Sequence, residues 1–159
     1  MKQRRNPADP AQLAKLRQRL EQQFMPDTAY PGTVSPIPSA GHCAVVSVIT
    51  MLKLGGGLAS TTVQGESHWF NRLSDGRQLW DVDLTGDQFG LPPVQVKPTG
   101  SLYPNATSQT FDALNIETLA RALRLAARAD MQDVAGMLSD VLAQRRAVAT
   151  HAKPERCAQ

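Results

Sequence analysis

Apolar residues form one nearly continuous run along the chain, from Ala44 to Leu52, directly after Cys43 and before Gly55-Gly56-Gly57. A run of this length without a polar face, closed by glycines, predicts a helix that is buried on all sides and begins near Cys43. Its β-branched residues also fit a buried strand, and this alternative stays open.

Apolar residues recur with helical spacing towards both ends of the chain. Asp9 suits an N-cap and Pro10 the first helical position, which predicts a helix over residues 10–24. Two further apolar stripes, over residues 116–129 and 131–145, predict a C-terminal helical hairpin. We expect these stripes to belong to the core and to cover the sheet; a surface for a protein partner or a homodimer is the alternative.

Alternation of polar and apolar residues between Glu66 and Thr85 predicts a β-hairpin. Asp75-Gly76 between the two runs is typical of a two-residue type I′ turn. Continuing the register from that turn places His68 directly opposite Asp83, close enough for the imidazole to hydrogen-bond to the carboxylate. A longer loop would shift this register, and a surface histidine beside a surface aspartate is the plainer alternative.

Composition indicates one domain of 159 residues with 42% hydrophobic residues, enough for a sizeable core. No apolar stretch approaches the length of a membrane span, and the basic N-terminus lacks the apolar stretch of a secretory signal. We therefore expect a cytoplasmic protein without a membrane segment. Two cysteines make no disulfide framework, and Cys157 is expected to be a bystander on a frayed tail.

The net charge of +3 is unevenly distributed, because residues 55–115 carry three basic and six acidic side chains. This acidic balance argues against a groove that follows a nucleic-acid backbone, and the basic ends lack interleaved aromatic residues. We therefore expect no nucleic-acid partner. Phosphate loops, dinucleotide fingerprints and kinase signatures are also missing from the sequence, so we expect no cofactor.

A cysteine in the first turn of a buried helix suits nucleophilic chemistry, because free backbone N–H groups and the helix dipole stabilise a thiolate there. The alternative is an inert packing residue. Zinc is a rival for the same atoms, since His42, Cys43, His68 and Asp83 are all acceptable ligands. However, the sequence lacks the paired ligand spacings that indicate zinc, so we expect no metal.

The expected order along the chain is a cysteine at the start of a helix, a histidine on a strand and an acid on the adjoining strand. This order resembles that of the papain-like cysteine hydrolases. Three segments of about residues 25–90 resemble the small bacterial YunG-like family, itself similar to those enzymes: Gly41-His42-Cys43-Ala44, Ser67-His68-Trp69-Phe70-Asn71, and Asp83-Leu84-Thr85 with Gln88-Phe89. The resemblance implies Cys43 as nucleophile, His68 as base and Asp83 as orienting acid. It also implies an α+β fold with a papain-like arrangement, in which a buried helix packs on a small antiparallel sheet and accessory helices flank this core.

The sequence departs from this resemblance at His42, where glutamine is expected before the nucleophile. The backbone N–H of Cys43 is available for an oxyanion hole, and His42 or the loop before it could supply a second donor. A loop imidazole exposed to water is the alternative for His42. We expect Asn71, Asp87 and Gln88 to line the substrate cleft. Trp69 is expected to lie in the core instead.

Two functions follow from these expectations. The first is a cofactor-free cysteine hydrolase or acyl transferase with a Cys-His-Asp triad, acting on an amide, isopeptide or thioester bond of a peptide or protein. The second is a non-catalytic protein-interaction module that retains the fold. Within the single domain we expect four regions: an N-terminal helix over 1–24, a papain-like catalytic core over 25–115, a helical hairpin over 116–146, and a disordered tail over 147–159.

Overall fold

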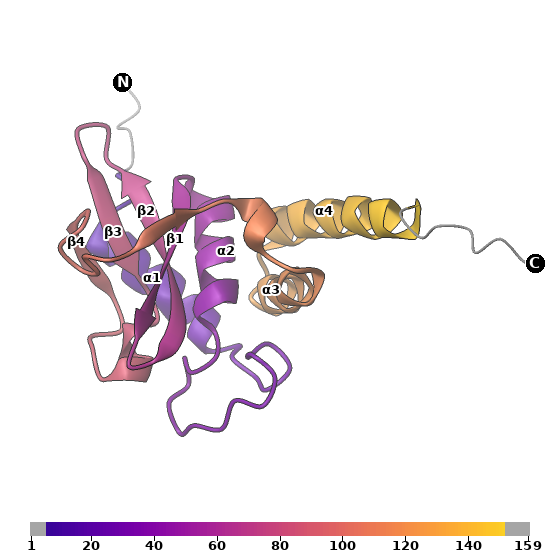
Figure 1. Ribbon diagram of the computed structural model, residues 1–159, viewed down its shortest axis with the longest axis horizontal. Helices are drawn as coiled ribbons and strands as arrows, with labels where there is room; N and C mark the ends of the chain where they lie inside the picture. The colour runs from indigo at the N-terminus through magenta and orange to yellow at the C-terminus, as the bar shows by residue number, and fades with distance from the viewer. Residues whose placement is uncertain (1–5, 152–159) are drawn as a thin grey trace, which may run out of the picture.

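The computed structural model describes residues 6–151, which form a sheet, a central helix and an outer pair of helices (Figure 1). These residues contain four α-helices and one five-stranded antiparallel sheet, which confirms the α+β class. In chain order the elements are α1 (Pro10–Glu21), α2 (Cys43–Leu54), β1 (Gly57–Val63), β2 (Glu66–Ser74), β3 (Leu79–Asp83), the 3-10 helix η1 (Gly86–Phe89), β4 (Gln95–Pro98), β5 (Thr107–Gln109), the 3-10 helix η2 (Phe111–Ala113), α3 (Ile116–Arg128) and α4 (Gln132–His151).

The central apolar run forms helix α2, and the alternative of a buried strand is wrong. Val48 and Ile49 are completely buried, as expected for a helix covered on all sides. The two polar residues of the run, Ser47 and Thr50, donate their hydroxyls to carbonyls one turn back, at 2.7 and 2.8 Å. The helix ends at Gly55, whose φ of +83° suits glycine.

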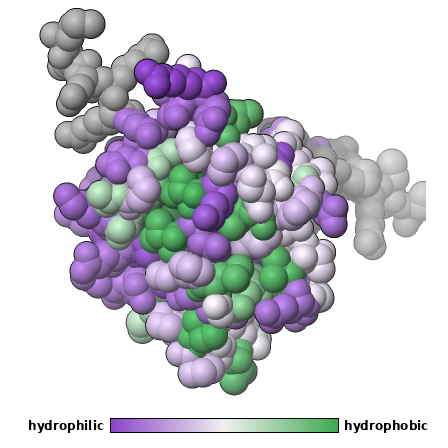
Figure 2. Space-filling view, turned by 90° about the vertical axis from the view of Figure 1, so that its left-hand side faces the viewer, coloured by the Kyte–Doolittle hydropathy of each residue, from purple (hydrophilic) through white to green (hydrophobic). Residues whose placement is uncertain are grey.

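The strands lie in the order β4-β3-β2-β1-β5, with every neighbouring pair antiparallel. Helix α2 packs against β2, and α1 contributes Leu13, Leu16 and Leu20 to the same core. Figure 2 shows the side of the molecule that carries β3 and β4, where hydrophobic residues form separate patches between hydrophilic ones. That side therefore presents no continuous apolar surface.

The β2–β3 hairpin has a four-residue loop, so the expected two-residue turn is wrong. Ser74 pairs with Leu79, and the loop between them is stabilised by the side chain of Asp75. Its Oδ1 atom accepts hydrogen bonds from the backbone N–H groups of Arg77 and Gln78, at 2.8 and 2.9 Å. An aspartate that binds two successive amides favours this wider turn over the two-residue type I′ turn.

The longer loop shifts the register of the hairpin by two residues. Asn71 pairs with Val82, so extending the ladder places Phe70 opposite Asp83. His68 is therefore the diagonal neighbour of Asp83 rather than its direct partner. Because side chains alternate with a period of two, the shift leaves both residues on the same face of the sheet.

The C-terminal helices cover α2 rather than the sheet, which corrects the expected position (Figure 1). Leu119, Leu125 and Leu138 of their apolar stripes are completely buried within the chain. These residues of the stripes therefore pack in the core, in agreement with the simpler expectation.

Helix α4 continues to His151, so the expected disordered tail is wrong for residues 147–151. The alanines of this segment favour helix, and the Thr150 hydroxyl donates to Arg146 O at 2.7 Å. Residues 152–159 of that expected tail, with Cys157, lie outside the described residues. Within residues 6–151, none of the helices is both long and apolar enough to cross a membrane.

Candidate active site

Cys43 is the first residue of α2 and is partly exposed. The turn before it depends on Gly41, whose φ is +75°. A Cβ atom at this position would lie 2.4 Å from Thr33 Oγ1 and 3.0 Å from the backbone nitrogen of Tyr30. The loop can therefore deliver the chain to Cys43 only with glycine at position 41.

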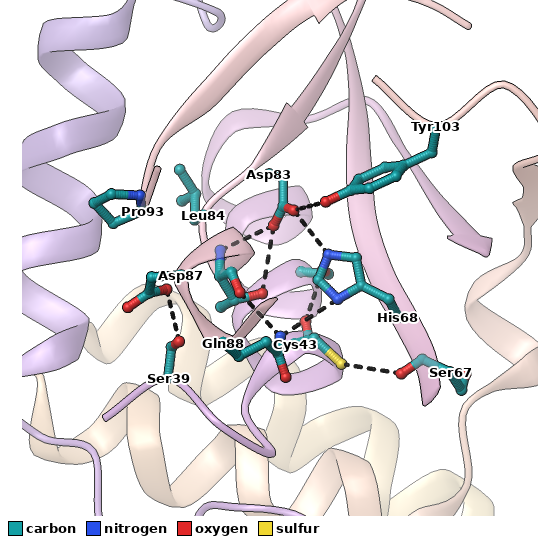
Figure 3. Close-up of polar contacts among 12 residues, drawn as sticks. Ser39, Cys43, Ser67, His68, Asp83, Leu84, Asp87, Gln88, Pro93 and Tyr103 are labelled. Atoms are coloured by element: carbon teal, nitrogen blue, oxygen red, sulfur yellow. Dashed lines mark hydrogen bonds and ion pairs between the residues drawn. The ribbon is translucent and has the colours of Figure 1, made fainter. Parts of the chain in front are cut away.

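His68 lies on β2, is completely buried, and makes the polar contact that the sequence predicted. Its Nε2 atom lies 2.7 Å from Oδ2 of Asp83, at the end of β3. The rings of Phe89 and Tyr103 pack edge-on against the imidazole. Figure 3 shows the Cys43 sulfur next to this ring, with Asp83 on the ring's other side. The structure thus brings together all three residues of the predicted triad.

Asp83 is held by more hydrogen bonds than the sequence predicted. The hydroxyl of Tyr103 donates to its Oδ2 atom at 2.5 Å, and the backbone N–H of Thr85 donates to Oδ1 at 2.9 Å (Figure 3). Burial, followed by the charge of Asp83, raises the pKa of Tyr103, which therefore keeps its proton and remains a donor. These donors fix the carboxylate that orients His68.

Tyr103 could not be identified from the sequence, because it lies on an irregular segment rich in proline and glycine. Only the packing of the loop between β4 and β5 against the sheet brings its ring beside His68 and Phe70.

His68 is held in its protonated form by its neighbours. Burial lowers the pKa of His68, but the hydrogen bond to Asp83 and the interaction with Cys43 outweigh it and raise the pKa to about 9. An imidazolium next to the sulfur favours the thiolate form of a cysteine. Because Nε2 is bound to Asp83, Nδ1 is the nitrogen left to exchange a proton with Cys43.

Gln88, on η1, lines the cavity at Cys43, as predicted. Its Nε2 atom donates to Thr85 O at 3.0 Å and lies 3.3 Å from Nδ1 of His68. An amide N–H can donate to Nδ1 only while that nitrogen is unprotonated. Gln88 therefore favours the neutral imidazole, but the stronger effect of Asp83 and Cys43 favours the imidazolium.

A cavity of about 610 Å³ opens at Cys43. Its walls come from the loop before α2, the start of β2, η1, and the segment from η2 into α3. Trp69 lines the cavity and also packs on the main core, so it belongs to both environments. A cavity of this volume suits a short segment of peptide or a small acyl group.

His42 is buried, which corrects both expectations for this residue. Only 2% of it is exposed, its ring stacks on Phe24, and its Nε2 atom lies 2.9 Å from the hydroxyl of Thr28. Its Nδ1 atom contacts Ala40 O at 3.0 Å. Burial lowers the pKa of His42. The side chain thus anchors the loop before α2 and points away from the cavity.

Asn71 and Asp87 do not line this cavity, which corrects two of the predicted positions. Asn71 is on the opposite face of β2 from His68, where its Nδ2 atom donates to Ser47 O of α2 at 2.8 Å. Asp87 forms a two-pronged ion pair with Arg17 of α1, at 2.9 and 2.8 Å. It also accepts a hydrogen bond from Ser39 at 2.6 Å. Both residues position elements around the site.

No group of three or more His, Cys, Asp or Glu side chains within residues 6–151 is arranged to hold a metal ion.

The model of a protein family described as YunG protein matches residues 12–127 of the chain. This match includes Cys43, His68 and Asp83. Neither curated proteins nor solved structures gave a match to the chain.

Proposed function

We propose that this chain, which belongs to the YunG family, is a cofactor-free cysteine hydrolase or acyl transferase acting on an amide, isopeptide or thioester bond. The observation that carries the proposal is the buried pair of His68 and Asp83, 2.7 Å apart, next to Cys43 in an open cavity. A helix that begins with the nucleophile and packs on an antiparallel sheet also supports a papain-like arrangement.

The first half of the proposed reaction breaks the scissile bond. The Cys43 thiolate attacks the carbonyl carbon and forms a sulfur–carbon bond, which gives a tetrahedral oxyanion. As this intermediate collapses, the bond to the leaving amine or thiol breaks, and His68 donates its Nδ1 proton to the leaving group. Asp83 stays ionised and holds the imidazole through Nε2.

The second half releases the acyl group. His68, now neutral, takes a proton from water while the water oxygen attacks the thioester carbonyl. The sulfur–carbon bond then breaks, the acid leaves, and the thiolate and imidazolium are restored. In an acyl transferase, an amine or alcohol would take the place of water.

Two donors are placed to stabilise the oxyanion. The backbone N–H of Cys43 makes no hydrogen bond within the described part of the chain, as expected for the first residue of a helix. The Nε2 atom of Gln88 keeps its hydrogen bond to Thr85 O but loses its second acceptor whenever Nδ1 of His68 is protonated, which frees one N–H group. Removing one donor of an oxyanion hole costs about two to three orders of magnitude in turnover. Gln88→Ala should therefore lower turnover more than substrate binding.

The proposal is tested with Cys43→Ala and Cys43→Ser on a panel of thiol-directed probes and of fluorogenic amide, isopeptide and thioester substrates. We expect a covalent adduct or product with the unmodified chain and a loss of several orders of magnitude in both variants, with the fold unchanged by circular dichroism. Serine is nearly isosteric but far less ionised beside the same histidine. Ser47→Ala, one turn further along α2, serves as the control and should retain activity.

A correctly folded chain that gives no Cys43-dependent adduct or product across this panel would contradict the proposal. The protein would then be better described as a non-catalytic interaction module. Equal activity of the Cys43→Ser variant and the unmodified chain would count against the proposal in the same way.

A further inference from the structure

Arg121 is a buried cation in α3 with incomplete hydrogen bonding. Only 6% of the residue is exposed. Its Nε atom donates to Glu117 O at 3.4 Å, and one terminal nitrogen donates to the Thr118 hydroxyl at 3.0 Å. The other terminal nitrogen, Nη1, is buried and has no partner among the described residues. Two N–H groups of a charged side chain are therefore left without an acceptor.

Within residues 6–151, Arg121 also lacks a counter-ion. No carboxylate of the described residues lies within 4 Å of its guanidinium. The other buried arginine, Arg17, is bound by both oxygens of Asp87. Burying an unpaired charge is costly, so such a group normally has a partner. The contrast between the two arginines indicates that Arg121 binds a partner that the described residues do not supply.

The position of Arg121 connects it to the candidate nucleophile, because its side chain lines the same cavity as Cys43. Burial lowers the pKa of Arg121 and the charge of Arg124 adds to this effect, whereas Cys43 acts in the opposite direction. Arg121 of α3 and Cys43 at the start of α2 therefore line one cavity. Among the described residues, the cavity wall contains one other charged side chain, Glu66, which is exposed and therefore well screened.

The guanidinium is covered on one face by the ring of Tyr30, whose centroid lies 5.6 Å from Cζ. Tyr30 is 67% exposed and its hydroxyl makes no hydrogen bond to the described residues. Tyr30 lines the same cavity, so its ring and the guanidinium lie side by side in the cavity wall.

We propose that Arg121 binds a carboxylate of the substrate, which would lie in the cavity near the bond attacked by Cys43. A carboxylate matches the fork of the guanidinium and would supply both the missing acceptor and the missing charge. This inference rests on the proposed function and narrows it to acyl compounds that carry an anionic group. The carboxylate could be a peptide C-terminus or an acidic side chain.

The test compares alkylation of Cys43 by iodoacetate, which is anionic, with alkylation by iodoacetamide, which is neutral and nearly the same size. For Cys43, the rate with iodoacetate divided by the rate with iodoacetamide should be about tenfold higher than the same ratio for the thiol of glutathione. The reason is that a nearby unscreened cation attracts the anionic reagent. Arg121→Gln should lower this ratio by about tenfold. Arg124→Gln removes the same charge from an exposed position of the same helix and should leave the ratio unchanged.

Arg121→Lys keeps the charge and should keep most of the iodoacetate preference, which provides a second variant if Arg121→Gln folds poorly. Two compounds then distinguish the sources of the carboxylate: acetyl-Gly-Gly with a free C-terminus, and acetyl-Asp-amide with a side-chain carboxylate. The compound that slows iodoacetamide labelling more strongly, in an Arg121-dependent manner, identifies the source.

The two proposals fail in different ways. Normal labelling by iodoacetamide without a preference for iodoacetate, or without protection by either compound, would overturn the role of Arg121 alone. Failure of iodoacetamide to label Cys43 selectively would overturn the cysteine chemistry itself, and the role of Arg121 with it.

Discussion

The Nε2 atom of His68 lies 2.7 Å from Oδ2 of Asp83, although the two residues are diagonal rather than direct neighbours across the β2–β3 ladder. Diagonal pairs are further apart at Cβ, and the side chains must lean along the strands to meet. The hydroxyl of Tyr103 and the backbone N–H of Thr85 hold the carboxylate in that position. The contact between His68 and Asp83 therefore depends on the residues that surround it.

The protonation of His68 should make stability depend on pH. Its folded pKa of about 9 lies above the ordinary value of 6.5, so the folded state binds more protons between these values. The stabilisation is fully present below about pH 6.5 and should be lost as the pH rises through 9, by about 3 kcal/mol. Urea unfolding from pH 6 to 10 measures this loss, and His68→Gln should abolish it.

Nuclear magnetic resonance of the imidazole protons checks the same assignment directly. The signal of His68 should titrate near pH 9, and that of buried His42 below its ordinary value of 6.5. For His42 the sign is reversed, because protonation on acidification favours the unfolded state. A His68 signal that titrates near 6.5 would contradict the charged pair.

Asp83→Asn should preserve the hairpin but lower turnover strongly, because an amide cannot stabilise the imidazolium and holds the wrong tautomer of His68. A loss of up to about four orders of magnitude in kcat is expected. The pKa of His68 should fall as well. Asp112→Asn, at an exposed position, is the matched control and should change neither value. Full activity of Asp83→Asn would exclude an orienting role.

Tyr103→Phe tests the donor that the sequence did not reveal. Removing its hydroxyl takes one of the hydrogen bonds from a buried carboxylate, which should cost about 2 kcal/mol in the free energy of unfolding. Turnover should fall less than in Asp83→Asn, because His68 and Thr85 still hold Asp83. Tyr30→Phe, where the hydroxyl makes no hydrogen bond to the described residues, should leave the stability unchanged in the same urea titration.

Asp87→Asn tests whether Asp87, which lies outside the cavity, stabilises the fold around the site. Arg17 would lose the carboxylate that binds both of its terminal nitrogens and would keep only the longer contact with Glu21, which should destabilise the fold by about 3 kcal/mol. Asp27→Asn breaks an exposed ion pair with Arg128 and should cost much less. Calorimetry of the two variants measures the difference. Equal melting temperatures would show that the pair of Arg17 and Asp87 does not support the fold.

Local patterns in the sequence were sufficient to predict where the helices lie. The apolar run after Cys43, the cap at Asp9 and the glycine at position 55 all predicted elements that the structure contains, because these signals act within one or two turns. The alternation along β2 likewise put His68 and Asp83 on one face. Although the register was wrong, its error was two residues, and an even shift preserves the face.

Most contacts between side chains of distant segments could not be predicted from the sequence. Tyr103 and Arg121 come from two separate segments, and no spacing relates them to Cys43. His42, Asn71 and Asp87 lie close to the triad residues in the sequence, yet their partners in α1, α2 and the preceding loop turn them away from the cavity. The sequence determined the elements and the face of the sheet that carries the chemistry. Tertiary packing decided which side chains share the cavity, because these contacts depend on the relative position of elements that are distant along the chain.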